Sequence, residues 1–348
     1  MAHPVTPPAP ERHPARLPSG KAVSCTVFKG SHESDVSHRL GQISNILEEE
    51  GTLVWFDVVD PGPNDLDVLR EEFDLHPLAI EDAIQAHQRP KIESYGKYWF
   101  LDVQATSLQG EDVQFHEIAI FAGTNFIVTV RHAPAYPLDE IKERWDAHRE
   151  GTERGAGFLL YTILDTIVDG YMPVGEIFSE KVDALEEMLF KRGRSANKDE
   201  VLPQIFAMKK DAQHFRRAVL PMRDILNPII RKDIELFPES DLDYFRDVYD
   251  HVVLVMDQLD SLRDIVNSAL EIHLSVVGNR QNEVAKQLTV IATIFLPLTF
   301  LTGFFGQNFG FLVTNVISHN WTFWVLGIGT EVVTLAITLG YFRLKGWF

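Results

Sequence analysis

The sequence predicts an α+β domain, a long helix that follows it, and two membrane-spanning helices at the C-terminal end. Three observations support this fold class. Short β-branched and aromatic runs alternate with helical patterns between residues 21 and 155. From Phe158 onward the apolar residues follow a helical spacing, and two long apolar runs lie close to the end of the chain.

The composition excludes several classes of protein. The chain has 348 residues, of which 45% are apolar and 24% charged, so it can bury a core and is not disordered as a whole. A single cysteine, Cys25, excludes an intrachain disulfide framework and a multi-cysteine metal site. With 32 basic and 50 acidic residues, the formal charge of -18 disfavours nucleic acid as a partner and favours cations.

The N-terminal half is expected to hold a tail and one domain. Residues 1–20 contain six prolines and no apolar run, so we expect a disordered tail rather than a signal peptide. Residues 21–155 are expected to form a cytoplasmic α/β domain without a glycine-rich phosphate loop. Helices are predicted at Asn64–Phe73, with Asn64 as the N-cap, and at Pro77–Ala86. The predicted strands are Val23–Phe28, Leu53–Val58, Tyr98–Ala105, Phe115–Phe121 and Phe126–Val130.

Residues 156–287 are predicted to be cytoplasmic helices, including a stalk. Apolar residues recur at helical spacing, and acidic residues occupy the opposite face. The pattern is expected to break at Pro221, Pro228 and Pro238. Beyond Pro238, only two glycines and one proline oppose a single helix over residues 241–305. Such a helix would be roughly 100 Å long, which suits a stalk that enters a bilayer.

Two apolar runs predict membrane spans. Residues 288–305 carry no charge over about 27 Å of helix, and residues 321–342 carry one, Glu331. The connecting loop, 306–320, has no charged residue. Two basic residues precede the first span, and two more lie in the tail at 343–348. These basic residues are Arg280, Lys286, Arg343 and Lys345. The positive-inside rule therefore places both chain ends in the cytoplasm and the loop outside.

The first span carries a stripe of mostly small or polar residues, which we call the polar stripe. It consists of Asn282, Ala285, Thr289, Ala292, Leu296, Thr299 and Gly303, at alternating intervals of three and four. Close packing between helices favours such residues, and from the stripe alone this interpretation is preferred. The alternative is a pore lining in a ring of copies, with Leu296 as a hydrophobic constriction.

Several motifs in this sequence occur together in one order. Gly306, Gln307 and Asn308 follow the run Phe295–Gly303 at the end of the first predicted span. This arrangement resembles the CorA family of divalent-cation channels, which has a GxN tripeptide at this place, usually Gly-Met-Asn. The similarity extends over nearly everything after residue 20. It includes the segments 76–82, 88–93 and 244–251, the positions Leu159, Asp165 and Asp169, and the closing Tyr341, Gly346 and Trp347.

The resemblance implies a funnel-shaped homopentamer in the plasma membrane. The first span would line the pore, the second would form an outer ring, and the cargo would be Mg²⁺, with Co²⁺ or Ni²⁺ as further cargo. Gly306, Gln307 and Asn308 would form the selectivity filter, where a ring of Asn308 amides binds the hydrated ion weakly. Asp82 and Asp247 would bind regulatory Mg²⁺ between neighbouring cytoplasmic domains, with Glu81 and Asp169 nearby.

Two alternatives remain open at this point. Gln307 in place of Met, the neutral loop and Glu331 within the second span favour a proton-linked Zn²⁺ transporter on the same fold. A non-conducting metal sensor or membrane tether is the other alternative. An enzyme is not expected, because the sequence has no nucleophile elbow, phosphate loop or HExxH motif. His251 has no second histidine within a helical turn, so we expect it on the solvated surface.

Overall fold

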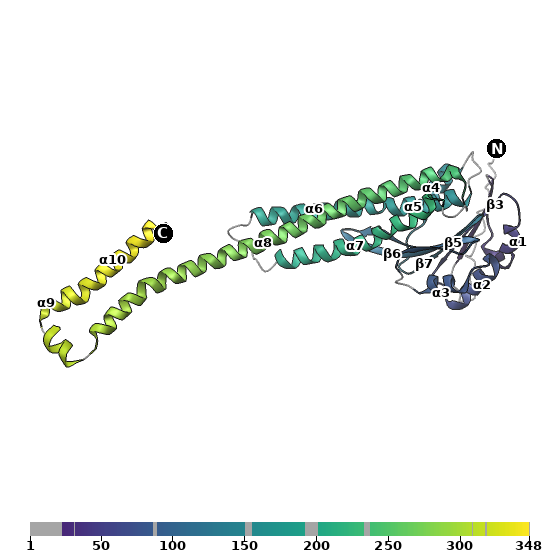
Figure 1. Cartoon of the computed structure of the whole chain (residues 1–348). Coiled ribbons are helices and arrows are strands. Elements are labelled where there is room, and N and C mark those ends of the chain that lie inside the picture. Colours follow the sequence, from purple (N-terminus) through teal and green to yellow (C-terminus); the bar gives the residue numbers. More distant parts are fainter. Residues whose placement is uncertain are drawn as a thin grey trace, which may run out of the picture. The chain divides into compact units, whose positions relative to one another are not determined.

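The computed structural model describes residues 23–30, 32–85, 89–149, 155–191, 201–232, 237–307, 309–316 and 319–347. The predicted tail at 1–20 lies outside these residues. The chain divides into two compact units, 1–269 and 270–348. The first unit holds a sheet with helices on both faces, and the second holds the apolar helices (Figure 1). These elements confirm the predicted fold class.

A seven-stranded sheet organises the first unit. Its strand order is β2-β1-β3-β7-β6-β5-β4, and every neighbouring pair is antiparallel except β3 and β7. The strands are β1 (Val23–Lys29), β2 (His32–Asp35), β3 (Thr52–Val59), β4 (Lys91–Ser94), β5 (Tyr98–Gln109), β6 (Asp112–Gly123) and β7 (Phe126–Arg131). All five predicted strands are present, and they are the ones with apolar runs. The two edge strands, β2 and β4, were not predicted because they are short and polar.

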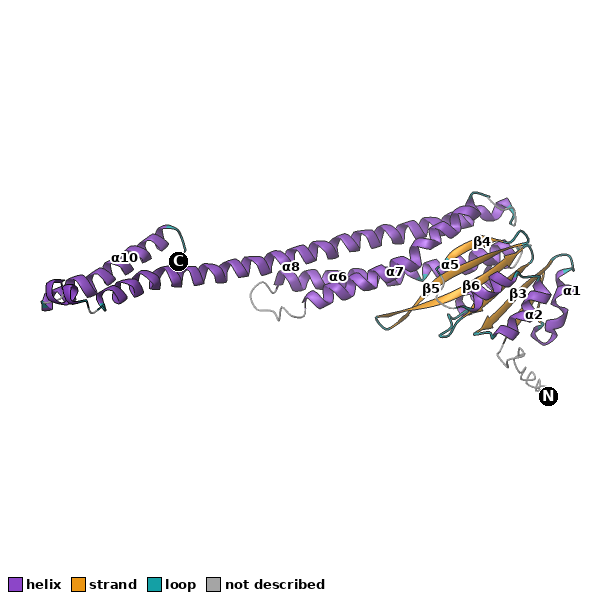
Figure 2. Ribbon diagram, turned by 60° about the horizontal axis from the view of Figure 1, so that its bottom comes forward, coloured by secondary structure: helices purple, strands orange, loops and turns teal. Residues whose placement is uncertain are grey.

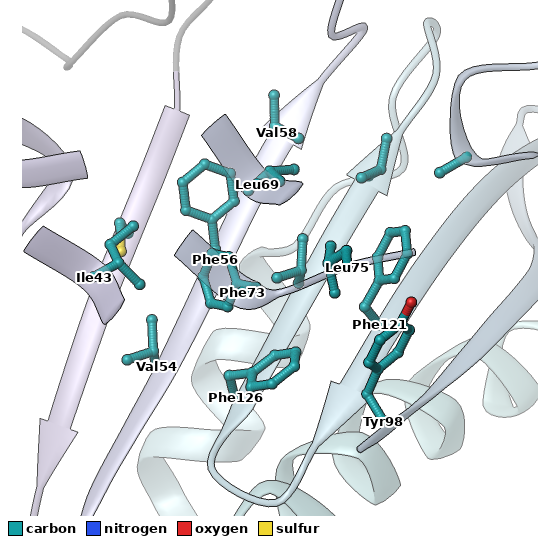
Figure 3. Packing of buried hydrophobic residues seen from close by; sticks show 14 of the residues in the cluster. Ile43, Val54, Phe56, Val58, Leu69, Phe73, Leu75, Tyr98, Phe121 and Phe126 are labelled. Atoms are coloured by element: carbon teal, nitrogen blue, oxygen red, sulfur yellow. The ribbon is translucent and has the colours of Figure 1, made fainter. Parts of the chain in front are cut away.

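Three helices cover one face of the sheet. They are α1 (Ile43–Leu47), α2 (Pro63–Phe73) and α3 (Pro77–Ile84), and their apolar residues pack on buried side chains of the sheet (Figure 3). Helix α2 begins at Pro63 with Gly62 as its N-cap, so the prediction of Asn64 as the cap was wrong by two residues. Asp65 takes over the capping contact, because its carboxylate accepts a hydrogen bond from the Gly62 amide at 2.8 Å. Pro77 does begin α3, as predicted.

The other face is covered by α5 (Ala156–Asp169), α6 (Tyr171–Lys191) and α7 (Val201–Ile230), as Figure 2 shows. Helix α4 (Asp139–Arg149) joins them, because its Trp145 packs on Phe28 of β1. Helix α5 is the central one, and most of its residues are buried. Pro221 and Pro228 lie inside α7 and do not interrupt it, contrary to prediction. A buried apolar face on both sides of Pro221 stabilises the helix enough to offset the missing backbone bond.

Helix α8 (Leu242–Phe305) runs without interruption through Gly278, Pro297 and Gly303. Its first part packs on α5 in the first unit, where Tyr244 contacts Phe158 and Tyr161 at ring distances of 5.4 and 5.0 Å. Residues 288–305, the first predicted span, form its last part.

The second unit contains the two candidate membrane spans. After α8 come a π-helical turn, η3 (Leu312–Val316), then α9 (Asn320–Thr322), a second π segment, η4 (Phe323–Ile328), and α10 (Gly329–Leu344). Among the described residues, two helices, Glu239–Phe305 and Phe323–Leu344, are long and apolar enough to cross a membrane, and their most apolar stretches are not buried within the chain. Exposed apolar surface of this extent is typical of helices that face lipid or partner helices.

Candidate metal centre and membrane segment

Two carboxylates and one imidazole come together where α5 meets α8. Each of Asp165, Asp247 and His251 offers one ligand atom, and these three atoms lie within 4.8 Å of one another. Asp247 and His251 are four residues apart on α8, so they share one face of the helix. The tyrosine and phenylalanine contacts between α5 and α8 hold that face against Asp165. We call these three residues the acid–histidine centre.

Asp169 borders this centre one helical turn beyond Asp165. Its Oδ1 lies 3.6 Å from Nδ1 of His251, and its Oδ2 accepts a hydrogen bond from Arg144 at 2.7 Å. Arg144 also donates to Oδ2 of Asp165 at 3.0 Å and to Glu140 at 2.7 Å. One guanidinium is therefore bound to three carboxylates beside the centre.

Carboxylates outnumber basic groups around the centre. Burial and, secondly, the charge of Asp169 raise the pKa of Asp165 above its usual value, and Asp247 adds to the increase, while Arg144 and His251 oppose it. Burial, followed by the charges of the nearby carboxylates, also raises the pKa of Tyr161, to about 12. A divalent cation would relieve this repulsion, since carboxylate oxygens are its preferred ligands and an imidazole suits transition metals. The exposed Asp247 leaves a route from solvent.

Asp82 lies in a different polar group, near the β4 edge of the sheet. Its Oδ2 accepts a hydrogen bond from Lys91 at 2.6 Å, and Lys91 also donates to Glu93 at 2.7 Å. Close by, Asp102 of β5 is almost fully buried, and its Oδ1 has no hydrogen-bond partner among the described residues. Burial and the charge of Glu117 raise the pKa of Asp102 to about 8.

The structure brings together only some of the predicted regulatory residues. Asp247 and Asp169 border the same centre, whereas Asp82 belongs to the Lys91 group and Glu81 accepts a hydrogen bond from Gln85. Asp82 lies on α3, which packs on one face of the sheet, whereas Asp247 lies on α8, which packs on α5 of the other face. Within one chain, the two carboxylates therefore belong to separate groups.

Sequence reasoning missed Asp165 and His251 as ligand candidates. The interpretation of His251 as a solvated surface residue was incomplete, because it is only partly exposed and stands beside two carboxylates. The spacing of four between Asp247 and His251, on a predicted helix, was the available signal. The contribution of Asp165 depends on how α5 packs against α8, which spacing does not reveal.

The polar stripe of α8 is exposed along its whole length in the chain. Its members are Asn282, Ala285, Thr289, Ala292, Leu296, Thr299 and Gly303. The hydroxyls of Thr289 and Thr299 donate to carbonyls one turn earlier, at 2.8 Å each. Each hydroxyl oxygen therefore keeps acceptor capacity for water or an ion, without an unsatisfied donor.

Local backbone hydrogen bonds form the C-terminal end of the first span. The amide of Gly306 donates to the Thr302 carbonyl at 2.9 Å, and that of Gln307 donates to Phe304 at 3.3 Å. Asn308, the third member of the predicted filter, lies outside the described residues.

Glu331 of α10 lines a cavity of about 330 Å³ within the second unit. Thr302 and Thr322 line the same cavity, among mostly apolar neighbours. Hydroxyls close to a carboxyl group offer it hydrogen-bond partners, which lowers the cost of a polar residue in an apolar span.

Comparison with known proteins gives a consistent result. A family model described as "CorA-like Mg2+ transporter protein" matches residues 50–344. The protein YfjQ of Bacillus subtilis is 32% identical, over 86% of this chain and 92% of its own length. The cobalt/magnesium transport protein CorA of Thermotoga maritima is 30% identical, over 95% and 97%. The solved structure of the CorA magnesium transporter from Methanocaldococcus jannaschii covers 93% of this chain and 98% of its own, with a TM-score of 0.74 and 23% identity.

Proposed function

The chain belongs to the CorA-like Mg²⁺ transporter family, and from this premise we propose that it conducts Mg²⁺ across the plasma membrane as a homopentamer. Co²⁺ is a second cargo, since relatives are named for cobalt as well as magnesium transport, and Ni²⁺ is a further candidate. The family consists of transporters rather than enzymes. The observation that carries the proposal is the uninterrupted helix α8, which has an exposed polar stripe along its apolar part.

Conduction follows from the chemistry of the polar stripe in a ring of copies. Two spans cannot enclose a water-filled path, so several chains must contribute. Thr289 and Thr299 would present hydroxyl oxygens to the hydrated ion, and Leu296 would form a hydrophobic constriction. At the outer mouth, Gly306, Gln307 and Asn308 form the filter. Neutral amides there bind hydrated Mg²⁺ without removing its water, so the ion can leave again.

The proposed regulatory Mg²⁺ ion binds between the cytoplasmic domains of neighbouring chains. Asp82 and Asp247 belong to separate polar groups within one chain, which supports a site where an ion bridges Asp82 of one chain and Asp247 of the next. Two facing carboxylates about 8 Å apart repel by roughly 2 kcal/mol at an effective dielectric constant of 20, which approaches ~10 kcal/mol over five interfaces before screening. About 5.5 kcal/mol is enough to move a gate from mostly closed to mostly open. Bound Mg²⁺ therefore favours the closed state, and its loss favours opening.

The residues around Asp247 fit such a regulatory ion. Asp165 and His251 supply an oxygen and a nitrogen within reach of the same point, and Asp169 lies beside them with an oxygen 3.6 Å from His251. Burial, followed by the charge of Asp169, raises the pKa of Asp165, and a bound cation would favour its ionised form. Glu81 is a weaker candidate, since its carboxylate is bound to Gln85 on its own helix.

The distribution of basic residues supports a topology with both chain ends in the cytoplasm. Arg280 and Lys286 precede the first span, and Arg343 and Lys345 follow the second, whereas the loop between the spans carries no charge. The ammonium of Lys286 lies 5.4 Å from the centre of the Trp347 ring. This cation–π contact agrees with a topology in which both residues lie on the same side of the membrane.

The proton-linked Zn²⁺ alternative is not favoured, because the Thermotoga maritima relative is named for cobalt and magnesium transport. Uptake into proteoliposomes separates the candidates. We expect entry of Mg²⁺ and Co²⁺ that is independent of a pH gradient and is blocked when Mg²⁺ is also loaded inside. Uptake of Zn²⁺ alone, with dependence on the gradient and on Glu331, would overturn the proposal. Absence of any flux from folded oligomers would leave the sensor or tether interpretation.

A further inference from the structure

Among the described residues, Arg144 of α4 is the one cationic residue that donates hydrogen bonds to both acidic residues of α5. Its Nη1 donates to Asp165 at 3.0 Å and to Asp169 at 2.7 Å, and its Nη2 donates to Glu140 at 2.7 Å. The guanidinium is about one-third exposed, and the Asp165 side chain is only 15% exposed. Arg144 thus neutralises buried charge next to the acid–histidine centre.

The guanidinium and the centre use the same carboxylates. Asp169 binds Arg144 through Oδ2 and has its Oδ1 3.6 Å from His251. Asp165 binds Arg144 through Oδ2 and is also one of the three ligand candidates of the centre. Any metal ion bound there would share its ligands with a resident cation.

The charges of the centre explain why a resident cation is needed. Asp165 and Asp169 are four residues apart on α5, a spacing at which like charges destabilise a helix. Asp247 adds a third negative charge from α8, and it contributes to the raised pKa of Asp165. Without metal, these carboxylates would repel one another, and Arg144 is the nearest group that opposes this.

We propose that Arg144 is a positioning residue of the metal centre, which holds Asp165 and Asp169 in place while no metal is bound and lowers the affinity of the centre for divalent cations. It thereby sets the cation concentration at which the centre fills. The proposal rests on the proposed regulatory function, because it assigns a role toward that same ion. The positive charge of Arg144 repels a divalent ion a few ångströms away. The carboxylates of Asp165 and Asp169, which are hydrogen-bonded to Arg144, are also less available as ligands.

The experiment measures binding of Co²⁺ and of Mg²⁺ to the full chain in detergent by isothermal titration calorimetry. Arg144→Gln removes the charge, and Arg144→Lys keeps it without the planar fork. Arg216→Gln is the matched control, because Arg216 also ties two helices, through Asp260 at 2.6 Å, away from the centre. Asp165→Asn and Asp247→Asn report whether the measured site is the acid–histidine centre.

We expect Arg144→Gln to bind both ions roughly tenfold more tightly than the unmodified chain. Arg144→Lys should stay within about twofold, and Arg216→Gln should be unchanged. Equal or weaker binding by Arg144→Gln would overturn the proposal. If the variant is too unstable to titrate, the rise in melting temperature on adding Co²⁺ replaces the titration, since tighter binding gives a larger rise. A rise no larger than that of the unmodified chain would also overturn it.

The two proposals fail in different ways. If Asp165→Asn and Asp247→Asn abolish binding but Arg144→Gln leaves it unchanged, only the role of Arg144 is refuted. If the unmodified chain has no saturable site that these two variants remove, the regulatory centre itself is refuted, and the inference fails with it.

Discussion

The ammonium of Lys91 lies 2.6 Å from Oδ2 of Asp82, so a carboxylate proposed to bind regulatory Mg²⁺ is already paired with a positive charge. Burial lowers the pKa of Lys91, but its bonds to Asp82 and Glu93 raise it by more, so the side chain stays charged. Both side chains are about 30% exposed, which leaves them partly screened by water. An ion that binds Asp82 has to displace Lys91 or share the carboxylate with it.

Replacing Lys91 should make inhibition by Mg²⁺ more sensitive. Lys91→Met removes the competing charge while keeping most of the side-chain volume over Phe100, whose ring centre lies 5.7 Å from Nζ. We expect the Mg²⁺ concentration that halves the current to fall several-fold, measured by electrophysiology with Mg²⁺ varied on the cytoplasmic side. Lys91→Arg should remain close to the unmodified channel. An unchanged inhibition curve for Lys91→Met would show that Asp82 does not bind the inhibitory ion.

Removing the charge of Asp247 should have the opposite effect. Asp247→Asn keeps the shape of the side chain but removes a negative ligand that faces Asp165 and His251. We expect the inhibitory Mg²⁺ concentration to rise roughly tenfold or more. Asp250→Asn is the matched control, because Asp250 is an exposed acid on the same helix. If both variants shift the curve equally, general surface charge rather than a specific site is responsible.

The amide of Asn308 is expected to control entry of the hydrated ion. Asn308→Ala removes the oxygen ring proposed at the outer mouth, so Mg²⁺ uptake into proteoliposomes should fall at least tenfold. Gln307→Met restores the tripeptide usual in the family and should retain uptake, which provides the comparison. Retention of oligomeric assembly is checked by cross-linking. Normal uptake by an assembled Asn308→Ala variant would refute the ring.

The apolar patterns were sufficient to predict the main elements of this fold. The apolar run at Leu53–Val58 is buried throughout, and Phe245 and Val252, which lie seven residues apart on α8, are buried as well, so the apolar pattern and the burial coincide there. The edge strand at Lys91–Ser94 was missed because three of its four residues are polar, and it forms through pairing with β5 rather than through its own apolar face. Pro221 was misjudged because packing around α7 outweighs local propensity.

The candidate site was predicted only as far as its individual motifs. Asp82, Asp169 and Asp247 were found through family resemblance, which assigns positions without contacts. The partners Lys91, Arg144 and Asp165 are set by the packing of α3, α4 and α5, and spacing along the chain carries no such information. Since these partners determine the charge at each carboxylate, the electrostatics of the site could be described only from the structure.

Asp102 should give the protein a pH-dependent stability. Burial, followed by the charges of Glu117 and Asp82, raises its pKa from 3.8 to about 8, while Lys91 opposes the rise. Between about pH 4 and pH 8 the folded state therefore keeps a proton that the unfolded state has released. Folding is then favoured at low pH and weakens as pH rises, by at most about 1.4 kcal/mol per pH unit.

Asp102→Asn removes this titration without changing the size of the side chain. The measured quantity is the melting temperature of the variant minus that of the unmodified chain, obtained by circular dichroism of the full chain in detergent. We expect this difference to be more positive at pH 8 than at pH 5. Asp112→Asn serves as the control, because Asp112 is exposed at the start of β6 and should change the melting temperature equally at both pH values. A difference for Asp102→Asn that is the same at both pH values would mean that Asp102 is already ionised in the folded state. In that case, the charge of Lys91 would have to neutralise Asp102 in addition to its two hydrogen-bond partners, Asp82 and Glu93.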